Sequence, residues 1–239
     1  MNDQGVIIDT AYAAFLASVG DGVPGDGNAD TYFLKPGYQS RTEAAYFVDN
    51  LDEAVYQPEV YEVAALAARR VNASYVIDVG CGQARKLMAL GDDFETIGID
   101  VGANLRHCQQ KYPTRTWLAC DLEESDSLPV APAVLARSVI VCSDVLEHLL
   151  HPEHLLLSLS AALRQAPLAI LSTPERDLTR GFRDMGPPEN PCHIREWNLA
   201  EFARLLEHYG LPPLRIGLTR TEDKWETAQT MLVFIGGGR

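Results

Sequence analysis

Val76-Ile77-Asp78-Val79-Gly80-Cys81-Gly82 is the stretch of this 239-residue sequence that says most about its fold. A strand-like run leads into two glycines, and a helical pattern follows over residues 84–90. Glycines at such a strand-to-helix turn let a ligand approach the backbone closely, and the amides that start the helix face that ligand. The stretch therefore predicts a cofactor loop on an α/β sheet.

From residue 75 onward, apolar strand-like runs alternate with amphipathic helical stretches, which is typical of a mostly parallel sheet covered on both faces. We expect strands at residues 75–79, 96–99, 116–118, 138–142, 168–172, 214–218 and 227–235, and helices at 84–90, 103–111, 153–163 and 199–209. The last two strands are expected to pair as a hairpin at the sheet edge. The predicted fold is a three-layer α/β sandwich with a seven-stranded, mostly parallel sheet whose last strand is antiparallel.

The chain divides into an N-terminal helical extension or lid, residues 1–72, and an α/β domain, residues 73–239. Helical patterns in the extension cover residues 7–19, 41–51 and 58–71, and a Gly-, Asp- and Pro-rich loop covers residues 20–30. Residues 173–192 hold four prolines and little periodicity, so we interpret them as an irregular loop. Loops of that length are often functional.

Composition excludes several classes of function. A formal net charge of −13 repels phosphate backbones and anionic membranes, which argues against nucleic acid as a partner. The five cysteines are widely spaced and never form Cys-x-x-Cys, as expected of reduced thiols in a cytoplasmic protein. The sequence shows neither a signal peptide nor a membrane-spanning stretch. The sequence leaves open whether the protein forms a homo-oligomer.

Two carboxylates narrow the identity of the cofactor. Arg85 stands where a dinucleotide-binding loop carries its third glycine, which favours a nucleoside without a pyrophosphate. Asp100 ends the next strand at the spacing of a ribose ligand, and Asp121 follows the third strand, where it can accept from an adenine amino group. Either residue alone is typical of a solvated turn, but acids in register after successive strands indicate a nucleoside site.

With these features the chain resembles the class I S-adenosylmethionine-dependent methyltransferases from about Tyr75 to its C terminus. The family's usual third loop glycine is Ala84 here. Arg41 is a candidate for the cofactor carboxylate, because related enzymes send an arginine there from the N-terminal helices; a solvated surface arginine is the alternative. The resemblance assigns S-adenosylmethionine as cofactor and implies that its site includes Asp78, Gly80, Cys81, Gly82, Asp100, Asp121, Leu122 and Ser143.

The fourth strand runs into residues 142–149, where substrates meet the cofactor in such sheets. On a helical turn Asp144, Glu147 and His148 share one face, where they could bind a hard divalent cation or hold the imidazole as a general base. The run resembles the metal-binding segment of ubiquinone-pathway O-methyltransferases and small-RNA 2′-O-methyltransferases, although Asp144 replaces their longer glutamate. Alternatively, Glu147 and His148 orient the turn and line the pocket. His151 and His154, around Pro152, are expected at the surface.

A second imidazole, His193, follows the irregular loop. In the resembling families a histidine at this point returns to the active site, where it could complete a metal site or deprotonate a hydroxyl. Arg195 and Trp197 are then candidates to shape the acceptor pocket. The alternative is that this whole segment serves in capping and packing. The candidate catalytic residues are His148, His193 and Asp144, and the candidate metal ligands are these three together with Glu147.

The expected function is methyl transfer to a small-molecule hydroxyl, because two available imidazoles favour an oxygen acceptor that needs a base. Residues 185–197 look like stretches of bacterial methyltransferases of surface-glycan or secondary-metabolite pathways, which points to a sugar hydroxyl. Three alternatives remain open at this stage. They are an RNA 2′-O-methyltransferase, a cofactor-binding regulator without catalysis, and a nicotinamide-dependent oxidoreductase.

Overall fold

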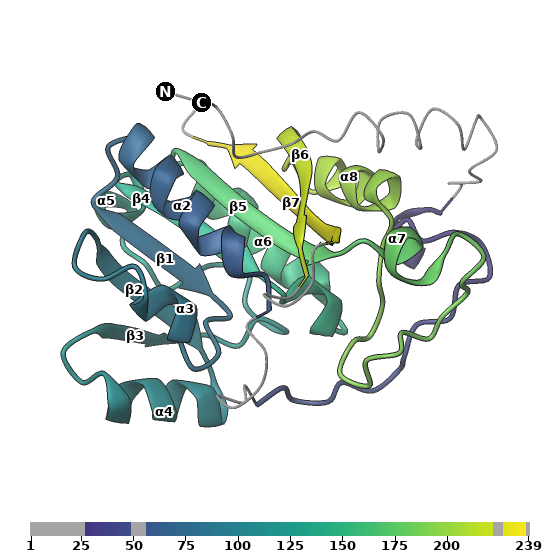
Figure 1. Ribbon diagram of the computed structural model, residues 1–239, viewed down its shortest axis with the longest axis horizontal. Helices are drawn as coiled ribbons and strands as arrows, with labels where there is room; N and C mark the ends of the chain where they lie inside the picture. The colour runs from purple at the N-terminus through teal and green to yellow at the C-terminus, as the bar shows by residue number, and fades with distance from the viewer. Residues whose placement is uncertain (1–26, 49–55, 222–226, 238–239) are drawn as a thin grey trace.

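A computed structural model describes residues 27–48, 56–221 and 227–237 and contains a seven-stranded sheet (Figure 1). The strands are β1 (Tyr75–Val79), β2 (Glu95–Asp100), β3 (Thr116–Ala119), β4 (Ser138–Ser143), β5 (Leu168–Pro174), β6 (Pro213–Arg220) and β7 (Ala228–Gly236). Their order is β3-β2-β1-β4-β5-β7-β6; β3 to β5 are parallel, and β7 is antiparallel to both neighbours. The predicted fold class and the terminal hairpin are confirmed.

Helices cover both faces of this sheet. The α-helices are α2 (Pro58–Arg70), α3 (Arg85–Met88), α4 (Gly102–Lys111), α5 (Pro132–Leu135), α6 (Pro152–Leu163), α7 (Arg176–Arg180) and α8 (Leu199–His208), and the 3-10 turns are η2 (Ala29–Thr31) and η3 (Leu146–His148). In the described part of the chain, no helix combines the length and apolar character needed to cross a bilayer.

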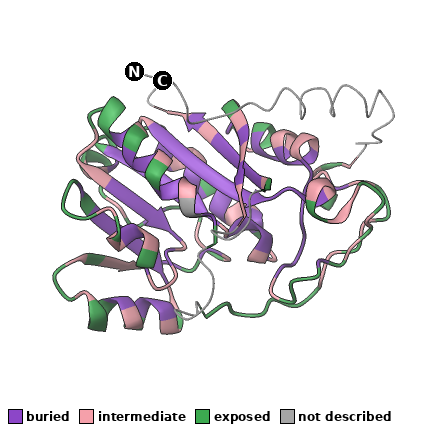
Figure 2. Ribbon diagram, in the orientation of Figure 1, coloured by how far each residue is buried: buried purple, intermediate pink, exposed green. Residues whose placement is uncertain are grey.

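The strands of the sheet centre are buried on both faces, as Figure 2 shows. Successive side chains of a strand point to opposite faces. Ile77 of β1 and Ile140 of β4 therefore pack in the cluster that contains α6 and α8, whereas Val76 and Val139 pack in the cluster that contains α2 and α3. These near-continuous apolar strands fix the sheet, and with it the strand ends that carry polar residues.

Residues 41–48 are extended, so the helix predicted over residues 41–51 is wrong for the described part of that range. A short helix draws most of its stability from packing an apolar face, yet residues 42–48 are exposed. Their contacts are made in an extended form instead. The Tyr46 hydroxyl donates to the carbonyl of Val101 at 2.8 Å, and the Asn104 amide donates to the carbonyl of Phe47 at 3.0 Å. The helix predicted at residues 7–19 lies outside the described residues.

The segment predicted as an irregular loop, residues 173–192, also holds the end of β5 and the short helix α7. Glu175 caps α7, because its carboxylate accepts from the amide of Leu178 at 2.7 Å. From Gly181 to Cys192 the chain is irregular, as expected. Helix α6 begins at Pro152, as the sequence indicates, and His151 next to it is exposed.

Candidate functional site

A cavity of about 390 Å³ opens at the carboxyl ends of the parallel strands, at the point where the strand order reverses between β1 and β4. This is where open α/β sheets bind their ligands. Residues 44–47, from the N-terminal part of the chain, also line the cavity. Its wall consists of residues 44–47, 56, 61, 80–82, 85, 86, 100, 101, 104, 120–123, 143–145, 148 and 149.

The loop between β1 and α3 forms one wall of the cavity. Gly80 and Gly82 have φ of +73° and +54°, and a Cβ at Gly80 would lie 2.5 Å from the Val145 side chain. Ala84, at the place of the expected third glycine, also adopts a positive φ of 59°. The loop is tied to β2, because the Gly82 amide donates to the Asp100 carboxylate at 2.8 Å.

The acids predicted to follow β2 and β3 both line the cavity. Asp100 accepts from the amides of Gly82 and Val101, at 2.8 and 2.7 Å, so its carboxylate has one orientation. Asp121 is exposed at the neighbouring strand end, and Leu122 follows it in the wall. Cys81 and Ser143 complete the predicted cofactor residues that the structure brings together.

Asp78 lies behind the cavity wall and is fully buried. The Tyr61 hydroxyl donates to its Oδ2 at 2.8 Å, whereas Oδ1 has no hydrogen-bond partner among the described residues. Burial raises the pKa of Asp78 from 3.8 to about 7, against the opposing effects of Tyr61 and Lys86. A cation on the cavity side of this carboxylate would offset the cost of its ionisation.

A cluster of four predicted residues stands at the edge of the cavity. Asp144, Glu147, His148 and His193 each offer a ligand atom, and these atoms all lie within 4.8 Å of one another. Asp144 follows β4 with φ +63°, and η3 carries the next two. The fourth arrives from a distant loop, because the Ile194 amide donates to the Glu147 carbonyl at 2.7 Å.

Hydrogen bonds orient both imidazoles of the cluster. Nδ1 of His148 lies 3.0 Å from the Cys192 carbonyl oxygen, and Nδ1 of His193 lies 2.6 Å from a Glu196 carboxylate oxygen. The carbonyl oxygen of Cys192 only accepts, so Nδ1 of His148 donates to it, and the Glu196 carboxylate holds the ring of His193 in place. Burial lowers the pKa of His148 to about 4, so this imidazole is neutral at neutral pH. The rings meet edge to face, with centroids 4.7 Å apart.

The two carboxylates of the cluster differ in their surroundings. Asp144 accepts a hydrogen bond at 2.8 Å from Nε2 of Gln57. Neither oxygen of Glu147 makes a well-formed hydrogen bond with a described residue, although Asp144 and Thr173 lie nearby. Burial and the charge of Asp144 raise the pKa of Glu147 well above its usual value. A buried carboxylate in this position is suited to a cation.

Gln57 is a site residue that the sequence pattern did not indicate. It directly precedes α2, has φ +50° and is buried. Its Oε1 accepts from the hydroxyls of Ser143 and Ser172, while its Nε2 donates to Asp144. A glutamine before a helix-starting proline carries no signal of such a role in a single sequence.

Three predicted site residues lie away from the cavity. Arg41 does not reach it, because its guanidinium donates to the carbonyls of Pro188 and His193 at 2.5 and 3.1 Å. Arg195 donates to the carbonyls of residues 149 and 150. Trp197 is fully buried in the core. The last two therefore serve in packing, which was the alternative considered for their segment.

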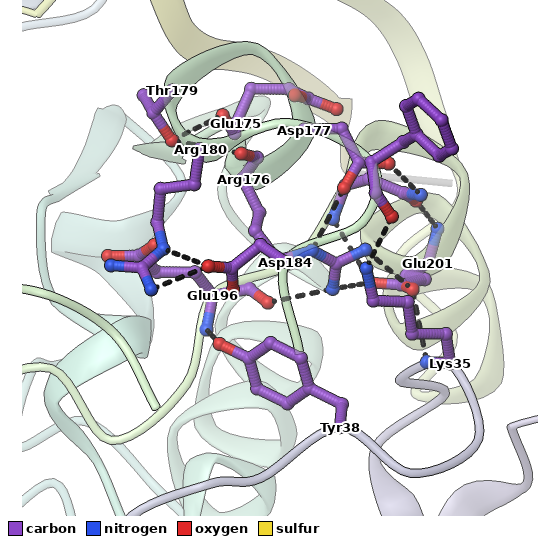
Figure 3. A network of polar contacts seen from close by, with 12 residues as sticks. Lys35, Tyr38, Glu175, Arg176, Asp177, Thr179, Arg180, Asp184, Glu196 and Glu201 are labelled. Carbon is purple, nitrogen blue, oxygen red and sulfur yellow. Dashed lines mark hydrogen bonds and ion pairs between the residues drawn. The ribbon is translucent and has the colours of Figure 1, made fainter. Parts of the chain in front are cut away.

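The polar network in Figure 3 supports the segment that carries Glu196. Arg176 and Glu201 form a fully buried ion pair, with nitrogen–oxygen distances of 2.7 and 3.0 Å. Arg176 also donates to the Glu196 carbonyl at 3.2 Å, and the Glu196 amide donates to the Tyr38 hydroxyl at the same distance. The network thus fixes the backbone of the residue that orients His193.

Comparison with known proteins identifies the family. The family model for a methyltransferase domain matches residues 55–215, which is more than half of the chain. The chain belongs to the methyltransferase family. A probable S-adenosylmethionine-dependent methyltransferase of Mycolicibacterium smegmatis is 30% identical over 173 residues, covering 72% of this methyltransferase and 59% of the relative. This methyltransferase thus spans little more than half the length of that curated relative.

Two solved structures share the fold of this methyltransferase. Magnesium protoporphyrin IX methyltransferase from Synechocystis PCC 6803 with bound SAH has a TM-score of 0.53 and 18% identity, covering 96% of this chain and 95% of the other. A small RNA methyltransferase has a TM-score of 0.55 and 16% identity, and the match covers 81% of this chain and 27% of the other. At these identities the likeness shows the fold alone, and the two names describe different acceptors.

The family and the site agree on the cofactor. This chain is a class I S-adenosylmethionine-dependent methyltransferase, and S-adenosylmethionine is its cofactor. The predictions of family, cofactor and fold class are thereby confirmed. The cofactor residues predicted one by one, and the acceptor, remain proposals.

Proposed function

We propose that this methyltransferase transfers the S-methyl group to a hydroxyl of a small molecule, at the cluster of Asp144, Glu147, His148 and His193. The observation that carries the proposal is this cluster, with two oriented imidazoles, at the edge of the cavity. Asp100 and Asp121 would hold the ribose and the adenine. In that arrangement the amino-acid end of the cofactor extends along Gly80 and Ser143 toward the cluster.

In this reaction the acceptor oxygen attacks the methyl carbon as the carbon–sulfur bond breaks, and the sulfur keeps the electron pair of that bond. The hydroxyl proton must leave as well, and a base aids such a weak nucleophile. The neutral imidazole of His148 is suited to accept it, and His193 stands next to His148 as the second candidate. His148 lines the cavity, so it would be the first to contact the acceptor.

The residues of the cluster also fit a divalent cation. Two carboxylates and two imidazoles lie within one coordination sphere, and Glu147 is buried without a well-formed hydrogen bond among the described residues. Both imidazoles have acceptors on Nδ1, the arrangement found around metal-bound histidines. A divalent cation held there would supply Lewis-acid activation of the acceptor hydroxyl. We favour this use of the cluster over an imidazole base alone.

We propose sugar hydroxyls as the first class of acceptor, following the resemblance of residues 185–197 to methyltransferases of glycan and secondary-metabolite pathways. Residues 44–47 line the cavity and would act with residues 173–192 as a lid over the acceptor. RNA is the second candidate, on the resemblance of residues 144–148 to the RNA enzymes. The net charge of −13 argues against RNA, because the backbone needs a basic channel.

The test is transfer of a radiolabelled methyl group from S-adenosylmethionine to sets of sugar nucleotides, phenols and small RNAs. We expect a labelled sugar product, whose formation is abolished by chelator and restored by Mn²⁺. Glu147→Gln should lose this activity, while His154→Gln, a change at a histidine outside the cluster, should keep it. Label in RNA alone, or label that chelator and Glu147→Gln both leave unchanged, would overturn the proposal.

A further inference from the structure

The cofactor carries a carboxylate on its amino-acid end, and the described cavity wall contains two basic side chains of the lysine and arginine type, Arg85 and Lys86. Both come from the first turn of α3. Arg41, the residue expected from the sequence to bind the carboxylate, is engaged with two carbonyls on another segment. The carboxylate therefore needs a different partner.

We propose that Lys86 binds the carboxylate of S-adenosylmethionine. Its Nζ donates to the carbonyl of Tyr56 at 3.1 Å and lies 5.0 Å from the centre of the Tyr61 ring. These contacts hold the half-buried ammonium against the end of α2. An ammonium has three donors, so two remain for a carboxylate.

The position of Lys86 within the site matches the end of the cofactor that carries the carboxylate. Lys86 lines the cavity together with Gly80, which follows β1, and Ser143, which ends β4, so it stands at the carboxyl ends of these two strands. Asp100 and Asp121 occupy the ends of β2 and β3, on the other side of the glycine loop. With adenosine at those acids, the amino-acid end reaches the side where Lys86 stands.

With the cofactor in this orientation, both charged groups of its amino-acid end have a partner of opposite charge in the protein. Oδ1 of Asp78, which no described residue hydrogen-bonds, is suited to the cofactor ammonium, and Lys86 is suited to the carboxylate on the same carbon. Arg85 is the weaker candidate, because it is exposed, whereas Lys86 is half-buried. Charge-assisted hydrogen bonds gain strength as solvent is excluded.

Calorimetry with three ligands tests the assignment without any acceptor. S-adenosylmethionine carries the carboxylate, decarboxylated S-adenosylmethionine lacks only that group, and 5′-methylthioadenosine lacks the whole amino-acid end. We expect the wild type to prefer the first ligand over the second by at least about tenfold. Lys86→Met should remove this preference and leave the affinity for 5′-methylthioadenosine unchanged, which also reports that the variant is folded.

Two further variants make the result specific. Lys86→Arg should keep the preference, because it keeps the charge, and Arg85→Met should keep it as a matched change in the same turn. The ratio of the two affinities decides, even where a variant weakens every ligand. A ratio that Lys86→Met leaves unchanged, or one that collapses in Arg85→Met instead, would overturn the proposal. Because no methyl transfer is measured, the result is independent of the proposed acceptor and of the proposed cation.

Discussion

Asp78→Asn is expected to make the ligand-free protein more stable relative to wild type as the pH rises. Asp78 is fully buried, and burial raises its pKa from 3.8 to about 7. The unfolded chain therefore loses this proton at a lower pH than the folded protein does. The wild type therefore loses stability as the pH rises from about 4 to about 7. The loss is absent below this range and complete above it.

The size of this effect follows from the two pKa values. One pKa unit corresponds to about 1.4 kcal/mol, so the interval from 3.8 to about 7 corresponds to about 4 kcal/mol. Asparagine keeps an oxygen that can accept from Tyr61 but cannot ionise. Between low and neutral pH, the free energy of unfolding of Asp78→Asn should therefore rise by about 4 kcal/mol relative to that of wild type. The buried amide of the variant adds a difference that is the same at every pH.

The assay is urea denaturation of both proteins at a series of pH values, with the free energies of unfolding compared at each pH. Asp121→Asn serves as the control, because this carboxylate is exposed at the same edge of the sheet and should show no comparable trend. A difference between Asp78→Asn and wild type that stays constant from about pH 4 to about pH 8 would refute the reasoning. It would mean that Asp78 is solvated or paired in the folded protein.

Other predictions follow from the contacts around the site. Gln57→Leu leaves buried polar partners unsatisfied and should lower the free energy of unfolding by about 2–3 kcal/mol, measured by urea denaturation, and weaken Mn²⁺ binding. Arg176→Met leaves the buried Glu201 carboxylate without its cation and should lower the free energy of unfolding by about 3–5 kcal/mol. The same change at the half-exposed Arg69 should lower it by less than about 1 kcal/mol. Tyr46→Phe removes the bond to Val101 and should weaken cofactor binding by calorimetry up to about tenfold. These assignments would be contradicted if Gln57→Leu or Arg176→Met were as stable as wild type, or if Tyr46→Phe bound the cofactor with unchanged affinity.

The sheet was predictable because its information is local. Strand β1 and the glycine loop after it are readable from apolar runs and turn residues, and the acids at the ends of β2 and β3 follow from the spacing of the strands. The turn that carries Glu147 and His148 was predictable for the same reason, whereas Asp144, expected on the same helical turn, lies before it with φ +63°. The arrival of His193 depended on a family resemblance, because nothing in the local pattern says where a distant loop returns.

What the sequence could not provide are tertiary contacts between distant segments. Residues 41–48 have an apolar composition that suits a helix, but they form none, and Tyr46 and Phe47 instead make hydrogen bonds with the start of α4. Arg41 was assigned to the cofactor carboxylate and instead holds the loop that carries His193. Gln57 shows the same limit, since its three partners come from β4, β5 and the residue after β4.

The most direct test of the account is paramagnetic relaxation of bound S-adenosylmethionine by Mn²⁺. In the proposed arrangement the cation lies in the cluster of Asp144, Glu147, His148 and His193. The S-methyl group would face it, and the adenine would lie at Asp121, farther along the cavity. In proton NMR we therefore expect Mn²⁺ to relax the S-methyl protons far more strongly than the adenine protons, and Glu147→Gln to remove the effect. Equal relaxation at both ends, or an effect that Glu147→Gln leaves intact, would contradict the central claim.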